Sequence, residues 1–311
     1  MDIVGKRRIF LAISGVATVV GLISIVLFGF KLAIDFTGGS VTQIVSTNNK
    51  AIDVKKIKDA FTTNKIQVVT IRKDSEKDVT VRTATITDAQ KNKALITANS
   101  NGTNIKEKSF NTLGPVIGGE TEKNALMAVG LAIVAITLYI AFAFRHVSKP
   151  VSSWKFGLSA IIALVHDVLI VLGAFSLLGL LFGIEIDTLF ITAVLTIMGF
   201  SVHDTIVVFD RIRENLLKNI HNLPFEELVN QSFNETLARS LNTSLTVILV
   251  LFALLLFGGE SVRWFIVAFL IGIITGTYSS IFVASAVLVE WYDLDKRGFK
   301  FSKLLKGGGK K

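Results

Sequence analysis

The sequence contains no cysteine and few charged residues, and each shortage excludes a class of protein. Without cysteine, the chain can form neither disulfide bonds nor thiolate metal sites. Only 18% of its 311 residues are charged, whereas 51% are hydrophobic. This balance is wrong for a soluble domain and typical of a membrane protein with several spans. The net charge of +9 comes from basic residues beside apolar runs, which favours a topology signal over nucleic-acid binding.

The sequence also lacks the motifs of nucleotide-driven and hydrolytic enzymes. It has no Walker loop, no Rossmann fingerprint, no Gly-x-Ser-x-Gly and no His-Glu-x-x-His. We therefore predict a protein that is not an enzyme and holds no cofactor or metal. If it does work, we expect the energy to come from an ion gradient rather than from ATP.

Long apolar runs predict a polytopic α-helical membrane protein with six transmembrane helices. About 20 apolar residues are enough to cross the lipid bilayer. The first run follows three basic residues and lacks the short core and cleavage site of a signal peptide, so we expect an uncleaved anchor. The runs cover residues 9–30, 125–144, 156–182, 189–209, 241–257 and 264–289.

The polar segment between the first two runs predicts an α+β domain. Its alternating stretches indicate four strands, and two amphipathic stretches indicate helices, the second capped by Thr87. The order β-α-β-β-α-β is typical of a ferredoxin-like sandwich. The expected strands are 41–46, 66–72, 79–86 and 103–110, and the expected helices are 53–64 and 87–99.

The distribution of basic residues predicts the orientation. They precede the first run and fill the loops near 145–155 and 211–239, whereas the opposite short loops carry mainly acidic residues. This asymmetry places both termini in the cytoplasm and the α+β domain outside. The expected parts are 1–30 with the first helix, the extracytoplasmic domain 31–123, helices two to six over 124–290, and a basic cytoplasmic tail over 291–311.

The fourth run carries ionisable side chains among apolar neighbours, at His203 and Asp204. Such residues cost about 2.5–3.5 kcal/mol each on insertion scales, so they are candidates for a functional site. Helical spacing places Asp204 on a face with Ser201 and Arg211, and His203 on a face with Asp210. We predict that Asp204 and His203 belong to a proton or ion relay.

A polar stripe at the start of the fifth run centres on Arg239. Two interpretations stay open. Arg239 either extends to the lipid headgroups, or it pairs with a carboxylate and favours the ionised form of that acid. The second interpretation makes Arg239 the third relay residue. The stripe consists of Glu235, Arg239, Asn242, Thr243 and Thr246.

His166 and Asp167 in the third run repeat the Val-His-Asp tripeptide that ends at Asp204. Because the two helices run antiparallel, we interpret the repeat as coincidence. Polar pairing between helices and ion conduction are both compatible with a secondary polar cluster of His166, Asp167, Asp210, Arg211, Asn242 and Thr243. A metal site built from His166, Asp167, His203 and Asp204 is a further alternative, because imidazole and carboxylate bind zinc or iron.

A glycine-bearing motif, Asp35-Phe36-Thr37-Gly38-Gly39-Ser40, joins the first helix to the polar domain. Glycine relaxes the backbone, so Asp35, Phe36, Gly38 and Gly39 are candidates for a hinge. Glycines at 114–119 form a matching exit. An ordinary turn at the membrane surface is the alternative.

Five motifs together resemble the SecF family of bacterial protein-export subunits. They are DFTGGS at 35–40, GPVIGGE at 114–120, GFSVHDTIVVFDRIREN at 199–215, TLARSLNTSLT at 236–246 and GTYSS at 276–280. The resemblance covers nearly the whole chain, and the fourth-helix motif is the most specific. The family pattern usually has asparagine where this chain has His203.

The resemblance implies an auxiliary translocase subunit of the RND-type superfamily in the bacterial cytoplasmic membrane. It implies a SecD-like partner, the SecYEG channel and an unfolded polypeptide in transit as partners, with the proton-motive force as the energy source. It also implies that Asp204 and Arg239 belong to the charged transmembrane cluster. A proton-coupled exporter of small molecules and a purely structural subunit are the alternatives, and the sequence leaves H⁺ or Na⁺ open.

Overall fold

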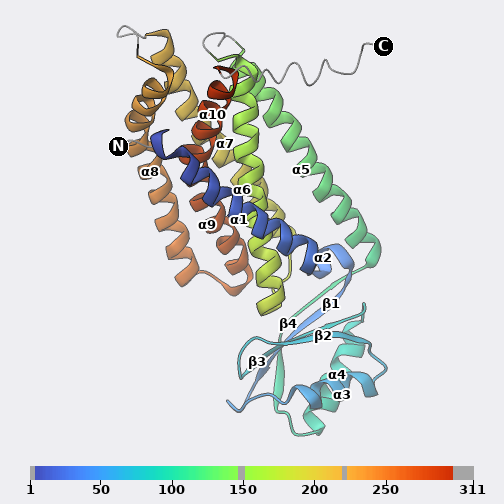
Figure 1. Ribbon diagram of the computed structural model, residues 1–311. Helices are drawn as coiled ribbons and strands as arrows, with labels where there is room; N and C mark the ends of the chain where they lie inside the picture. Colours follow the sequence, from blue (N-terminus) through green and yellow to red (C-terminus); the bar gives the residue numbers. More distant parts are fainter. Residues whose placement is uncertain (1–3, 146–150, 219–222, 297–311) are drawn as a thin grey trace, which may run out of the picture. The chain divides into compact units, whose positions relative to one another are not determined.

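The computed structural model of the chain describes residues 4–145, 151–218 and 223–296 (Figure 1). In this part of the chain, six helical segments are long and apolar enough to cross a membrane. The chain divides into two compact units, one made of Met1–Gly29, Val129–Leu178 and Leu189–Lys311, and the other of Phe30–Ala128 and Gly179–Thr188. Most of the predicted tail, residues 297–311, lies outside the described residues.

The predicted spans are observed as long helices, each of which begins before its apolar run. The fifth span is lengthened most relative to its apolar run. The amphipathic stretch before that run is helical too, and it buries Phe225, Leu228 and Phe233. The spans are α1 (Arg7–Phe28), α5 (Pro115–Ala143), α6 (Ser153–Phe182), α7 (Thr188–Leu217), α8 (Phe225–Phe257) and α9 (Arg263–Ser279) continued by η3 (Ser280–Ala284) and α10 (Ser285–Lys296); η1 (Val4–Lys6) and η2 (Glu260–Val262) are short 3-10 turns.

The last span changes its winding near its middle. The α-helical turns of α9 end at Ser279, and η3 is a π-helical segment that begins at Ser280. Single π turns inside α-helices are rare and are frequently found at functional sites.

Small residues let the helices approach closely. A Cβ atom on Gly173 of α6 would lie 2.4 Å from the Cα atom of Gly21 in α1. A Cβ atom on Gly272 would lie 2.2 Å from the side chain of Ile197 in α7. Without a hydrophobic driving force between helices in lipid, such close backbone packing stabilises the bundle.

The second unit contains the predicted β-α-β-β-α-β order. The sheet order is β2-β3-β1-β4, and all neighbouring strands are antiparallel. Residues from both helices and from β1 and β3 share one hydrophobic core. The elements are β1 (Gly39–Ser46), α3 (Val54–Thr63), β2 (Val68–Lys73), β3 (Asp78–Thr83), α4 (Asp88–Ser100) and β4 (Ile105–Leu113), after the short helix α2 (Ile34–Thr37).

Local sequence explains where the two helices of this unit begin. Asp53 caps α3 by accepting a hydrogen bond from the backbone N–H of Lys55 at 3.0 Å. Thr87 and Gln90 form a reciprocal capping box at the start of α4, as the predicted cap requires.

The short loop between α6 and α7 belongs to the second unit, which the sequence does not reveal. The backbone N–H of Ala33 donates to Ile186 at 2.8 Å, and Ile186 donates to the carbonyl of Lys31 at 2.7 Å. The guanidinium of Arg82 binds the carboxylate of Glu185 at 3.0 Å. The unit is therefore covalently linked to the spans at four points, through α1, through α5 and through both ends of this loop.

The glycine motif at the entrance of this unit is tightly packed. Gly38 and Gly39 have φ angles of +68° and +116°, which strongly favour glycine. A Cβ atom on Gly38 would lie 2.7 Å from Pro115, and one on Gly118 would lie 2.8 Å from the carbonyl oxygen of Phe36. The entrance and exit thus form one joint, and motion at this joint stays a prediction.

Lys91 is a buried cation on the sheet-facing side of α4. Its ammonium group binds Asp88 at 2.8 Å and Glu107 at 2.7 Å, and it lies 4.4 Å from the ring centre of Phe110. Burial lowers the pKa of Lys91, but the hydrogen bonds to Asp88 and Glu107 outweigh it, so that the pKa is raised above its ordinary value.

Replacing Lys91 with alanine is expected to destabilise the second unit by roughly 1–3 kcal/mol, because two charged hydrogen bonds and the packed aliphatic stem are lost. Lys93→Ala, at an exposed position of the same helix, is the control and should change stability by less than about 0.5 kcal/mol. Urea unfolding of the full chain, followed by limited proteolysis of this unit, measures both.

The raised pKa also sets a pH dependence. The contribution of Lys91 to the free energy of unfolding is fully present below its ordinary pKa of about 10.5. This contribution is lost as the pH rises through the higher pKa that Lys91 has in the folded state. The difference between wild type and Lys91→Ala should therefore shrink above that pH. If wild type and Lys91→Ala differ in stability by the same amount at pH 8 and at a pH above the pKa of folded Lys91, this assignment is contradicted.

Candidate functional site

Asp204 of α7 is buried between α8 and the last span. Its side chain accepts two hydrogen bonds, from Ser240 Oγ at 2.7 Å and from Ser280 Oγ at 2.6 Å. The residue is only 6% exposed. In the part of the chain that the structure describes, the carboxylate is thus held by hydroxyl groups from two other helical segments and by no cation.

Asp167 of α6 has a similar environment. Its Oδ2 atom accepts hydrogen bonds from Ser201 at 2.5 Å and from Ser279 at 2.6 Å, and its Oδ1 atom lies 2.9 Å from Nδ1 of His166. Asp167 is fully buried. The Val-His-Asp repeat, interpreted above as coincidence, therefore places two carboxylates in matching serine-lined sites.

Two consecutive serines on the last span serve the two carboxylates. Ser279, the last residue of α9, binds Asp167, whereas Ser280, the first residue of the π turn, binds Asp204. Gly276 lets the last span lie close to α7 here, because a Cβ atom on Gly276 would lie only 3.3 Å from the Cβ atom of Ser201.

The buried polar stripe of α8 is not the predicted one. The buried side chains are Ser232, Thr236, Ser240 and Ser244, spaced four apart. Ser244 accepts a hydrogen bond from Thr277 of α9 at 2.6 Å. A hydroxyl group is small and can bond to the carbonyl one turn earlier, so it is readily buried in a helix interface.

The predicted stripe lies on the exposed side of α8. Glu235, Arg239, Asn242, Thr243 and Thr246 are all exposed in this chain. Within the described residues Arg239 forms no ion pair with Asp204, and His203 is exposed as well. The three predicted relay residues are therefore not brought together by this chain alone.

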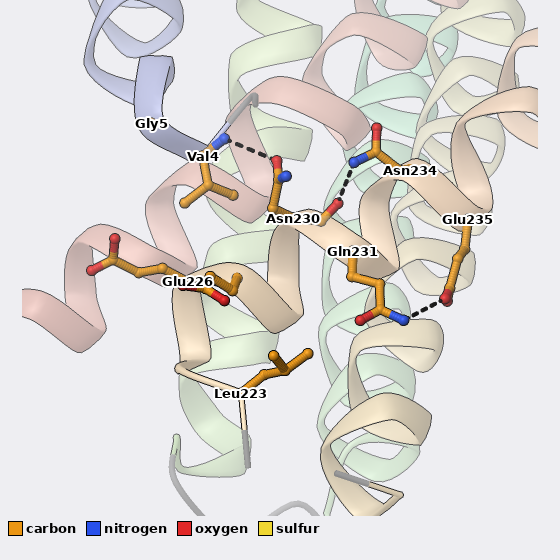
Figure 2. Close-up of a pocket in the computed structure, with 9 residues that line it drawn as sticks. Val4, Gly5, Leu223, Glu226, Asn230, Gln231, Asn234 and Glu235 are labelled. Atoms are coloured by element: carbon orange, nitrogen blue, oxygen red, sulfur yellow. Dashed lines mark hydrogen bonds between the residues drawn. The ribbon is translucent and has the colours of Figure 1, made fainter. Parts of the chain in front are cut away.

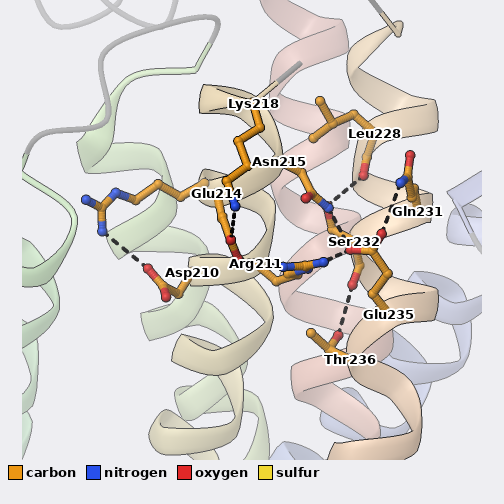
Figure 3. A network of polar contacts seen from close by, with 11 residues as sticks. Asp210, Arg211, Glu214, Asn215, Lys218, Leu228, Gln231, Ser232, Glu235 and Thr236 are labelled. Carbon is orange, nitrogen blue, oxygen red and sulfur yellow. Dashed lines mark hydrogen bonds and ion pairs between the residues drawn. The ribbon is translucent and has the colours of Figure 1, made fainter. Parts of the chain in front are cut away.

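The ends of α7 and α8 are joined by a charged network, which includes part of the predicted secondary cluster. Figure 3 shows Arg211 between two carboxylates, with Glu214 at 2.6 Å and Glu235 at 2.6 Å. Asn215 donates to Ser232 at 2.9 Å and to Glu235 at 2.8 Å. These contacts fix the register of α7 against α8 a few turns from Asp204.

The remaining members of the secondary cluster do not converge. Asp210 is exposed and pairs with Arg213 at 3.2 Å, on the same helix. His166 and Asp167 lie in the interior of the helix bundle, whereas Asn242 and Thr243 lie on the exposed side of α8. Among the described residues, no three His, Asp or Glu side chains lie close enough to hold a metal ion.

A cavity of about 750 Å³ lies between η1 and the first turns of α8 (Figure 2). Its lining is rich in carboxylates and amides, and the backbone N–H of Val4 donates to Asn230 across it at 3.4 Å. It contains neither Asp204 nor Arg239, so it is separate from the serine-lined sites.

The sequence pattern identified Asp204 but missed the serines that hold it. Ser201, Ser240, Ser279 and Ser280 are uncharged and common, so only their spacing relative to a buried acid could have indicated them. The motifs around Ser240 and Ser280 were singled out as family features, without a chemical role.

Two family profiles match the chain. One, described as "Protein export membrane protein SecD/SecF, C-terminal", covers residues 92–294. The other, described as the "SecD/SecF GG Motif", covers residues 23–47 and contains the glycine pair Gly38 and Gly39.

Relatives match over nearly the full length. "Protein translocase subunit SecF" of Thermobaculum terrenum is 44% identical over 307 residues, which is 95% of each chain. "Protein translocase subunit SecDF" of Thermus thermophilus is 39% identical over 85% of this chain, but the match covers only 35% of that longer protein.

Two solved structures share the fold. The crystal structure of SecDF from Thermus thermophilus, described as a translocon-associated membrane protein, matches with a TM-score of 0.80 and 35% identity, over 94% of this chain and 39% of that one. A SecDF structure in a "super-membrane-facing form" matches with a TM-score of 0.66.

The double variant Ser240→Ala, Ser280→Ala is expected to raise the fraction of Asp204 that is protonated, because two donors to the carboxylate are lost. Dicyclohexylcarbodiimide reacts with protonated carboxylic acids in apolar surroundings, so labelling of Asp204, measured by peptide mass spectrometry, should rise severalfold. Ser244→Ala, one turn along α8 with no bond to Asp204, is the control. Equal labelling in all three proteins would contradict the assignment.

Proposed function

Since the chain belongs to the SecD/SecF family of protein export membrane proteins, as a SecF-type translocase subunit, we propose that it uses the proton-motive force to promote preprotein export. Its partners in this proposal are a SecD-like subunit and the SecYEG channel. Both termini lie in the cytoplasm of the bacterial cell, and the unit that contains the β-sheet lies outside and holds the emerging polypeptide.

The observation that carries the proposal concerns the hydrogen-bond partners of Asp204. Among the described residues, only the hydroxyl groups of Ser240 and Ser280 donate to its side chain. A hydroxyl can donate to a carboxylate or, after rotation, accept from a carboxylic acid. Ser240 and Ser280 can therefore serve Asp204 with and without its proton. A fixed cation would hold the carboxylate permanently ionised, whereas this site suits binding and release of a proton.

The exposed stripe of α8 supports a membrane partner. An arginine facing lipid costs about 2.5–3.5 kcal/mol on insertion scales, so Arg239 favours a polar protein surface. Asn242 and Thr243 continue the same exposed stripe. A SecD-like subunit fits because the matched Thermus thermophilus relative is a SecDF chain of which this sequence covers only a part. In this complex Arg239 acquires the acidic partner that the isolated chain does not provide.

The chain connects Asp204 to the second unit by a short path. The segment Gly179–Thr188 belongs to that unit and contains the loop that joins α6, which carries Asp167, to α7, which carries Asp204. Asp35 of the glycine motif accepts two hydrogen bonds from Thr188, the first residue of α7. A shift of α7 on protonation of Asp204 therefore acts on the unit through both covalent and hydrogen bonds.

The energy available is of the right size. One charge that crosses the membrane supplies about 2.3 kcal/mol per 100 mV. A few protons can therefore supply the several kcal/mol that a domain movement requires. The two SecDF structures, which share 35% identity with this chain, superimpose on it to different extents.

Asp204→Asn and Arg239→Met are each expected to remove the stimulation of preprotein export by a proton gradient. Vesicles that contain the channel, the SecD-like subunit and this chain measure it, with and without an imposed gradient. Asp210→Asn, an exposed acid on the same helix, is the matched control and should keep the stimulation. If both variants respond to the gradient like wild type, the relay is wrong, and if dye is exported instead of preprotein, the small-molecule alternative holds.

A further inference from the structure

His166 and Asp167 form an ionisable pair that the cycle at Asp204 does not use. Both residues are buried, and Asp167 is completely enclosed. The acceptor positions of Asp167 are occupied by two serine hydroxyls and one imidazole nitrogen. Asp167 is therefore held by three hydrogen-bond partners inside the helix bundle, and His166 is the one of them that can carry a balancing positive charge.

The second ring nitrogen of His166 is the open position of this pair. Nε2 is buried and has no hydrogen-bond partner among the described residues. If Nδ1 carries the only ring proton and donates to Asp167, the pair has a net charge of −1. A proton added at Nε2 makes the ring an imidazolium, and the pair becomes neutral. The pair can thus take up one proton without losing its internal hydrogen bond.

Among the described residues, no cation is bound to this pair. On α7, Asp204 is buried one turn beyond Ser201, whereas His203 is exposed. On α9, the hydroxyl of Tyr278 donates to the backbone of Phe10. On α1, within the described residues, the charged groups are Arg7 and Arg8 at its start, where Arg7 is bound to Glu290 and Asp293.

The other neighbouring segments carry charges only towards their ends. Lys155 near the start of α6 pairs with Asp295. The acidic and basic residues of α5, together with Arg145, lie at its two ends, and Tyr139 is exposed. On α8 the charged residues precede Ser240 in the chain, and on α10 they follow Val289.

Two hydroxyls on the same helices add to the polar character of this region. Ser159 of α6 and Thr205 of α7 are buried, and their oxygen atoms have no partner in the described part of the chain. Both lie on the side of Asp167 towards the start of α6 and the end of α7. A hydroxyl both accepts and donates, so each can pass a proton onward.

We propose that His166 and Asp167 form a second proton-binding site, in which His166 Nε2 takes the proton and Asp167 stabilises the resulting imidazolium. Imidazole is the side chain whose ordinary titration falls between about pH 5 and 8, which suits uptake and release at cellular pH. The inference rests on the proposed function for its purpose, because it adds a second proton site to the same helical core. Its chemistry can be tested without export.

The test is nitrogen NMR of the full chain with its SecD-like partner in lipid nanodiscs, with the histidines labelled. The chain has four histidines, and loss of one signal in His166→Gln assigns His166. In wild type, the His166 ring should change from neutral to imidazolium as the pH falls from about 8 to about 5. In Asp167→Asn, this ring should stay neutral over the same range, since the charge would have no partner. Asp210→Asn, the matched exposed acid, should titrate like wild type.

Each outcome separates this inference from the proposed function. A wild-type His166 ring that keeps one charge state from about pH 5 to 8 overturns the second site, whatever Asp204→Asn does to export. An unchanged titration in Asp167→Asn also overturns it, because Asp167 would then not hold the imidazolium. If His166 titrates as expected while export ignores the proton gradient, the second site stands and the proposed function fails.

Discussion

Two carboxylates held by serine hydroxyls within a bundle of apolar helices are the constraint on which this structure depends. Asp167 and Asp204 each receive two serine hydrogen bonds, and the donors come from three other helical segments. These bonds require close helix packing, which the glycines on α6 and α9 permit. Charge in the core, small residues at the contacts and the π turn at Ser280 therefore form one arrangement.

Much of the fold could be predicted from the sequence, because its signals are local. Apolar length gave the spans, alternation gave the strands, and the caps at Asp53 and Thr87 set where two helices begin. The sequence does not predict that the segment Gly179–Thr188 belongs to the second unit. Its contacts, such as that of Arg82 with Glu185, join residues far apart in the chain.

The candidate site could be predicted only in part, for a physical reason. A charged residue in an apolar run is conspicuous, so Asp204 and Asp167 were found. Serine is neither apolar nor charged, so it gives no strong signal in a helical pattern. The pattern therefore favours Arg239 and its polar neighbours as the functional face of α8, whereas the buried face contains Ser240. Only the packing of three helices decides which polar face of α8 is turned inward. Arg239 lies on the exposed side of α8, and in the proposed function it pairs with an acid of a second protein.

The adjacency of Ser279 and Ser280 has a thermodynamic consequence. Consecutive residues on a helix point about 100° apart, so one helix segment presents a donor to each acid at once. A rotation of that segment cannot weaken one bond while leaving the other untouched. In the proposed cycle, a proton that binds at one acid and rotates this segment also changes the proton affinity at the other acid, and the same factor applies in the reverse direction. Coupling of this kind acts through the last span itself.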